Sequence, residues 1–184
     1  FLIRPTKYDD DGYLLRHFRG VLPSNTLACL HALTADVRER RALGSVNVRS
    51  HLCDESVQPV PERHILRLAR RRGTRTLVCL VGVQTSQFPR AAELAERFRA
   101  HGIAVILGGF HVSGTIAMAS STPPHLQRLL DAGVTLVKGE GGESWAVLLR
   151  DPVDGKLAPL SDSIDDKPER FRLGHLTQER DLSA

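Results

Sequence analysis

The chain has 184 residues, of which 41% are hydrophobic and 25% are charged, and its formal net charge is +4. These totals suit one globular domain with a core of its own and exclude a wholly disordered chain. No apolar run approaches the roughly 18 residues that a membrane-spanning helix needs. The basic residues form no stripe interleaved with aromatic residues, so we expect neither nucleic acid nor a membrane as a partner.

The cysteines and the start of the chain suggest where the protein works. Cys29, Cys53 and Cys79 have neither disulfide nor metal-site spacing, which favours the reducing cytoplasm. The chain begins with Phe1 and shows no signal peptide. We therefore expect a cytoplasmic domain excised from a longer protein.

Short apolar runs alternate with amphipathic segments along the first 150 residues. In chain order we expect a strand over Phe1–Arg4, a helix over Asn25–Arg41, a strand over Ser45–Ser50, a helix between Pro61 and Gly73, and a strand over Thr76–Val83. There follow a helix between Pro89 and Gly102, a strand over Ile103–Leu107, a helix over His125–Ala132, a strand over Val134–Val137 and a helix over Glu143–Leu149. Serine and proline at helix starts and glycine at helix ends support these bounds.

This alternation predicts an α/β fold with an open parallel five-stranded sheet and helices on both faces, of the flavodoxin-like (Rossmann-like) class. The run over Thr76–Val83 is apolar almost throughout, as a strand buried on both faces should be. Residues 1–150 are expected to form this domain. Residues 151–184 turn polar and are expected to form a linker or tail.

The run Ala104–Gly114 is the most informative part of the sequence. In an open α/β sheet, ligands bind beyond the carboxyl ends of the strands. Gly108 and Gly109 stand at such an end, and because they lack Cβ a ligand can lie directly on their backbone. His111 and Ser113 follow, with a titratable ring and a hydroxyl beside that surface.

Three of the predicted strand ends together resemble a known family. The segments are Val81–Ser86, which reads VGVQTS, Val105–Ser113, which reads VILGGFHVS, and Val137–Glu143, which reads VKGEGGE. In combination they resemble the cobalamin (B12)-binding domain of the radical-SAM proteins, in which the cofactor lies across the carboxyl edge of the sheet. The resemblance is specific over Leu80–Leu149 and weaker over the first 80 residues.

The resemblance implies a cobalamin-binding module, the N-terminal part of a B12-dependent radical-SAM enzyme that carries out methyl transfer or radical rearrangement. It implies these cofactor-binding residues: Gln84, Thr85, Ser86, Gln87, Gly108, Gly109, Phe110, His111, Ser113, Gly139, Glu140 and Gly141. The radical-SAM motif CxxxCxxC is absent from this chain. An iron–sulfur cluster, S-adenosylmethionine and the catalytic residues would therefore belong to a C-terminal radical-SAM domain that is missing here.

The cobalt ligand departs from the better-known cobalamin domains. Those domains carry DxHxxG after the first strand, whereas the loop here, Tyr8–Tyr13, has no histidine. The axial ligand is therefore unknown, and His111 is not assigned to replace it.

Other functions remain open at this point. The acidic run Asp9–Asp11 and Lys138 resemble parts of a response-regulator receiver, but no aspartate stands at Val83–Thr85 to accept a phosphoryl group. A ligand-free sensory or protein-interaction domain of flavodoxin-like fold is the main alternative. An enzyme acting through His111 would lack a visible partner carboxylate or nucleophile.

Overall fold

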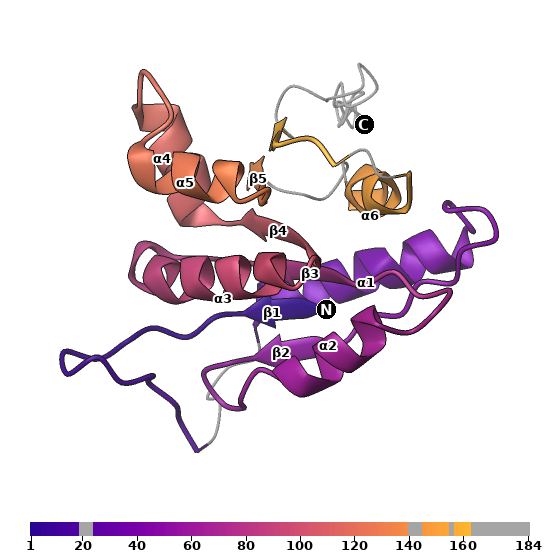
Figure 1. Cartoon of the computed structure of the whole chain (residues 1–184), viewed down its shortest axis with the longest axis horizontal. Coiled ribbons are helices and arrows are strands. Elements are labelled where there is room, and N and C mark those ends of the chain that lie inside the picture. Colours follow the sequence, from indigo (N-terminus) through magenta and orange to yellow (C-terminus); the bar gives the residue numbers. More distant parts are fainter. Residues whose placement is uncertain (19–23, 140–144, 155–156, 163–184) are drawn as a thin grey trace, which may run out of the picture.

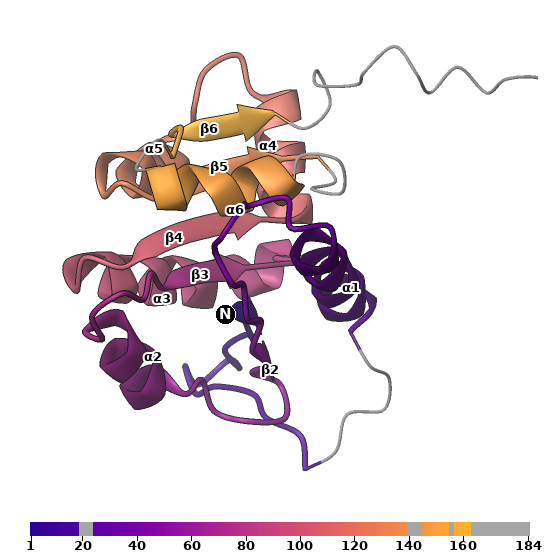
Figure 2. The same cartoon turned by 90° about the vertical axis from the view of Figure 1, so that its right-hand side faces the viewer.

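The computed structural model describes residues 1–18, 24–139, 145–154 and 157–162. They form an α/β fold around one parallel sheet, whose strands stack from β2 at the bottom of Figure 2 to β6 at the top. The strands are β1 (Leu2–Arg4), β2 (Leu52–Asp54), β3 (Leu77–Leu80), β4 (Ala104–Gly108), β5 (Thr135–Lys138) and β6 (Leu160–Asp162). The spatial order β2-β1-β3-β4-β5-β6 includes the order 2-1-3-4-5 found in flavodoxin-like sheets.

Helices cover both faces of the sheet (Figure 1). One face carries α1 (Asn25–Glu39) and α6 (Trp145–Asp154). The other carries α2 (Glu62–Ala69), α3 (Phe88–Ala100), α4 (Phe110–Met118) and α5 (Pro124–Asp131). A short 3₁₀ turn, η1 (Thr85–Gln87), leads into α3.

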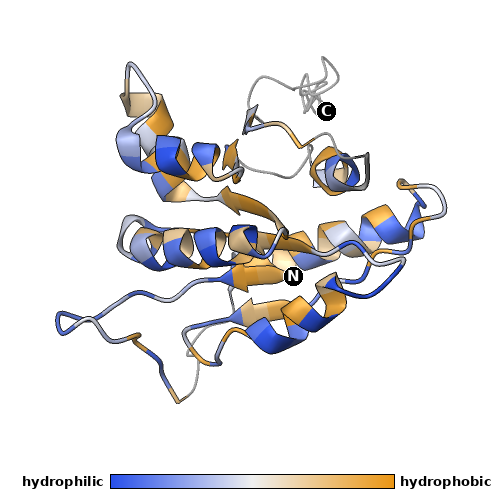
Figure 3. Cartoon of the chain, viewed as in Figure 1, coloured by the Kyte–Doolittle hydropathy of each residue, from blue (hydrophilic) through white to orange (hydrophobic). Residues whose placement is uncertain are grey.

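Two separate cores result from the alternation of side chains along the central strands. In β3, Val78 and Leu80 face the core under α2–α5, while Cys79 faces the core under α1 and α6. All three side chains are buried. Burial on both faces explains why the strands are hydrophobic almost throughout, whereas the helices carry hydrophilic outer faces (Figure 3).

The strand predicted over Ser45–Ser50 is wrong. The strand that pairs with β1 is β2, in the register Leu2↔Leu52 and Ile3↔Cys53. Val46, which lies in the predicted segment, is 42% exposed. An edge strand forms where it can pair in register with its neighbour, and β1 pairs with Leu52–Asp54.

The predicted number of strands is also too small, because the described residues form a sheet of six strands rather than five. The sixth, β6, lies in the segment expected to be a linker or tail, and it pairs in parallel with β5 through Leu136↔Leu160. Its only large apolar residue, Leu160, is 45% exposed. A three-residue edge strand of this kind is held by backbone pairing and leaves little hydrophobic signal.

A helix, α4, occupies the segment after β4 that was expected to be a loop. Val112 of this helix is fully buried in the core under α2–α5. The connection from β4 to β5 therefore contains two helices, α4 and α5. Among the helices that the structure describes, none is long and apolar enough to cross a lipid bilayer.

Candidate functional site

The carboxyl edge of the sheet brings together the segments that follow β3, β4 and β5. The Val83 amide donates to the Gly108 carbonyl (3.2 Å), and the His111 amide donates to the Val83 carbonyl (3.0 Å). The Gly139 amide donates to Ser113 Oγ (3.0 Å). Three segments that are distant in the sequence are thus joined by hydrogen bonds, as their positions at one sheet edge predict.

The two glycines at the end of β4 lie close to other parts of the chain, and at Gly109 the contact requires glycine. Gly109 has φ +143°, and a Cβ there would lie 2.2 Å from the Val83 nitrogen. A Cβ on Gly108 would lie 3.3 Å from Val137 Cβ. The space that the missing Cβ leaves is therefore filled by neighbouring strand ends, not kept open for a ligand as the sequence suggested.

The polar residues of η1 and its N-cap, Gln84, divide into three exposed side chains, called the rim here, and one buried side chain. Gln84, Thr85 and Ser86 are exposed. Gln87 is 8% exposed. Its side-chain Oε1 accepts from the backbone N–H of Gln84 (3.0 Å), and its side-chain Nε2 donates to the Pro5 carbonyl (2.8 Å). The Gln87 side-chain amide is thus engaged within the protein. The Gln84 side chain accepts from the Gln87 backbone N–H and Thr85 Oγ1 lies 3.4 Å from His111 Nδ1, but all three exposed side chains can still present hydrogen-bonding groups to a ligand.

Residues 110, 111 and 113 lie in the first turns of α4, not in a loop. Phe110 is 69% exposed, so its ring offers an apolar surface at the rim. Ser113 Oγ accepts from Gly139, as described above. Glu140 and Gly141, also predicted to bind the cofactor, lie outside the described residues.

His111 belongs to a cluster of three rings from three helices. Its ring centroid lies 4.2 Å from that of Phe88, and its Nε2 lies 3.3 Å from Nε2 of His125. Its Nδ1 lies 3.4 Å from Thr85 Oγ1. Burial and the neighbouring His125 lower the pKa of His111, which favours the neutral ring.

Sequence reasoning missed both partners of His111. Phe88 begins α3 and His125 lies in the first turn of α5. No motif links these positions to His111, since their proximity arises only when α3, α4 and α5 pack on the same face of the sheet. No local signal in the sequence could have identified them.

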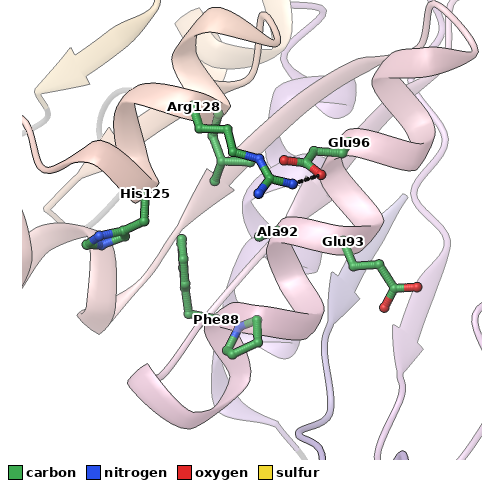
Figure 4. A pocket seen from close by; sticks show the side chains of 8 residues that line it. Phe88, Ala92, Glu93, Glu96, His125 and Arg128 are labelled. Atoms are coloured by element: carbon green, nitrogen blue, oxygen red, sulfur yellow. Dashed lines mark hydrogen bonds and ion pairs between the residues drawn. The ribbon is translucent and has the colours of Figure 1, made fainter.

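A shallow depression lies beside this cluster, between α3 and α5 (Figure 4). Its volume is about 310 Å³, and it is lined by Phe88, Pro89, Ala92, Glu93, Glu96, His125, Arg128 and Leu129. Arg128 reaches across to Glu96 (2.6 Å). The ion pair leaves this depression without a free charge from Arg128 or Glu96 that would attract an ionic ligand.

A buried charged network holds the other side of the edge, beside β1 and β2. Arg90 donates to both oxygens of Glu55 at 2.6–3.2 Å, and to Glu93 at 2.7 Å. The Glu55 side chain is 0% exposed. Tyr8 donates to Glu93, and the Thr6 amide donates to Glu55 (3.2 Å). This network ties the loop after β1 to α3 and to the residue that follows β2.

The acidic run after β1 stabilises its own loop. Asp9 Oδ1 accepts from the amides of Asp11 (3.1 Å) and Tyr13 (2.7 Å), in the manner of an Asx turn. Within the part of the chain that the structure describes, no group of three or more histidine, cysteine, aspartate or glutamate side chains is arranged to hold a metal ion.

Comparison of the chain with protein-family models, with curated proteins and with solved structures gives no significant match.

Proposed function

We propose that the chain is a cobalamin-binding module and that the cofactor lies across the carboxyl edge of the sheet. One observation carries the proposal. The three segments that resemble the radical-SAM cobalamin domains follow three neighbouring strands and are hydrogen-bonded to one another at one edge.

The residues at the edge fit a large amphipathic cofactor at its rim. A corrin ring needs an apolar surface and hydrogen-bonding partners for its peripheral amides. Phe110 supplies an exposed ring, and Gln84, Thr85 and Ser86 supply exposed amide and hydroxyl groups. Arginine is absent from these positions, which suits a cofactor with many neutral amides better than a triphosphate.

The glycines would act indirectly in this proposal. They allow the ends of β3, β4 and β5 to approach closely, which sets the distance between the η1 rim and the first turn of α4. Ser113 would hold the β5 end in place through Gly139. Gln87 would hold η1 to the loop after β1.

Bound cobalamin would supply a cobalt centre that carries a methyl group or takes part in radical chemistry. The chain's own residues would bind the cofactor and orient it toward a neighbouring domain. The resemblance makes a radical-SAM domain, with an iron–sulfur cluster and S-adenosylmethionine, the proposed partner.

The first test is retention of hydroxocobalamin. The protein is mixed with excess hydroxocobalamin and passed through a desalting column, and the corrin absorbance of the protein fraction is measured. We expect the cofactor to be retained. Loss of all corrin absorbance from a protein with an intact circular dichroism spectrum would overturn the proposal.

The rim residues are tested by a double variant, Thr85→Ala/Ser86→Ala. Loss of two hydrogen bonds, each worth about 0.5–1.5 kcal/mol, should weaken binding about tenfold. Thr74→Ala is the matched control, because Thr74 is exposed at the opposite end of β3. Equal affinity in the double variant and the control would remove η1 from the site.

The apolar contact is tested by Phe110→Ala. The side chain is 69% exposed, so its removal should lower affinity without lowering stability. Val46→Ala is the control, since Val46 is 42% exposed and lies in the segment before β2, not in a segment that follows the carboxyl end of a strand.

One observation favours a second candidate function, a ligand-free interaction domain of the same fold. The internal contacts of Gly108 and Gly109 account for both glycines without any ligand. A stable protein that retains no cobalamin would support this alternative.

A further inference from the structure

We propose that His111 and His125 form a two-histidine site for a divalent transition-metal ion such as Zn²⁺. The two side chains come from the first turns of α4 and α5. Their Nε2 atoms face each other at 3.3 Å. The site goes beyond the proposed cofactor function and does not depend on it.

The separation of the two nitrogens matches a shared tetrahedral ion. Histidine nitrogens lie about 2.0–2.1 Å from Zn²⁺, and two ligands at the tetrahedral angle of about 109° are then about 3.3–3.4 Å apart. His111 and His125 have this spacing before any metal is added. His125 is exposed, so its ring can turn until its Nε2 lone pair points at the same ion as the Nε2 lone pair of His111.

The surroundings of His111 hold its ring in a ligating orientation. Metal-bound histidines usually engage their second ring nitrogen in a hydrogen bond, which fixes the tautomer. Here Nδ1 lies 3.4 Å from Thr85 Oγ1, and the ring contacts Phe88 with the two centroids 4.2 Å apart and the ring planes tilted by 35°. A proton on Nδ1 leaves the Nε2 lone pair directed toward His125.

A basic side chain beside the site is neutralised by an acidic one. The nearest basic side chain lining the adjoining depression, Arg128, is paired with Glu96 at 2.6 Å, which offsets its repulsion of a cation.

Two protein ligands leave the remaining coordination positions to water or to an external ligand. The described residues provide no third histidine, cysteine or carboxylate in the same group. Catalytic zinc sites usually have three protein ligands and structural sites four. With two, this site is open, and we expect its ion to be exchangeable.

The test is a Zn²⁺ titration of the full chain without cobalamin, followed by calorimetry and by ¹H–¹⁵N spectra of the histidine rings. We expect one ion to bind per chain and the ring resonances of His111 and His125 to shift most. The chain has eight histidines, so weak binding elsewhere is the background against which this site is measured.

Substitutions decide the assignment. His111→Gln and His125→Gln should each weaken Zn²⁺ binding at least about tenfold, and Thr85→Val should weaken it less by freeing the His111 ring. His101→Gln is the matched control, since His101 is exposed at the end of α3 and should bind as the unaltered chain does.

Equal Zn²⁺ affinity in His125→Gln and His101→Gln, or shifts spread evenly over all histidines, would overturn the proposal. His125 is exposed, so its substitution should leave folding intact and decide the matter even if His111→Gln is unstable. Because cobalamin takes no part, a failed retention experiment and a failed Zn²⁺ titration are distinguishable.

Discussion

The two halves of the carboxyl edge are held together by different means. Beside β3, β4 and β5, backbone groups meet directly, and Gly109 lets its strand end approach Val83. Beside β1 and β2, side chains hold the segments together: Arg90 and Glu55 form a buried ion pair that connects segments distant in the sequence. The backbone contact depends on two adjacent glycines, Gly108 and Gly109, which can be recognised in the sequence. The ion pair joins Glu55 and Arg90, which are 35 residues apart, and no local sequence pattern reveals it.

The largest effect is expected from breaking the charged half. Arg90→Met leaves the carboxylate of Glu55, which is 0% exposed, without its partner. The free energy of unfolding should fall by about 3–5 kcal/mol. Urea denaturation followed by circular dichroism measures this.

A double variant shows whether the loss comes from the charge itself. In Glu55→Gln/Arg90→Met, the amide oxygen can still accept from Thr6, and no buried charge remains. This variant should recover much of the stability lost in Arg90→Met. A double variant as unstable as Arg90→Met would contradict the ion-pair explanation.

A slightly smaller effect is expected from the backbone half. Gly109→Ala would place a Cβ 2.2 Å from the Val83 nitrogen at a φ of +143°, and should cost about 3 kcal/mol. Gly114→Ala is the matched control, because Gly114 lies inside α4 with nothing within 4 Å of its Cβ position. The control should gain about 0.5–1 kcal/mol. Similar stability changes in both variants would refute the close-approach argument.

The smallest effect concerns the outer part of the charged network and depends on pH. Burial would raise the pKa of Glu93, but hydrogen bonds from Tyr8 and Arg90 and the charges of Arg90 and Arg97 lower it overall. A carboxyl group whose pKa is lower in the folded than in the unfolded state stabilises the protein when the pH is above the unfolded-state pKa. This stabilisation is lost as the pH falls through the folded-state pKa.

Tyr8→Phe removes one of these hydrogen bonds. It should reduce the free energy of unfolding by less than about 1 kcal/mol near pH 7, since Glu93 is 41% exposed, and the difference should shrink near pH 3. Urea denaturation at the two pH values measures the difference. A gap that widens as the pH falls would show that Tyr8 does not act through the Glu93 carboxylate.

The parts of the site that could be predicted from the sequence are the local features, and the parts that could not are the contacts between distant segments. The apolar runs of β3, β4 and β5 and the polar residues after them are local features, and the structure brings them to one edge as expected. The roles of Gln87 and Gly109 were not predictable. Gln87 binds the Pro5 carbonyl and Gly109 meets Val83, and both partners become neighbours only when the strands assemble.

The sequence by itself determined the α/β class and the central strands, because burial on both faces demands uninterrupted apolar residues. Only the tertiary structure decided the edge strands β2 and β6, since short edge strands depend on pairing with a neighbour more than on their own residues. It also decided the partners of His111 and the pairing of Arg90 with Glu55. Those contacts join helices and loops that are far apart in the chain, and the hydrophobic periodicity that places each helix on the sheet does not encode which polar side chains meet at its end.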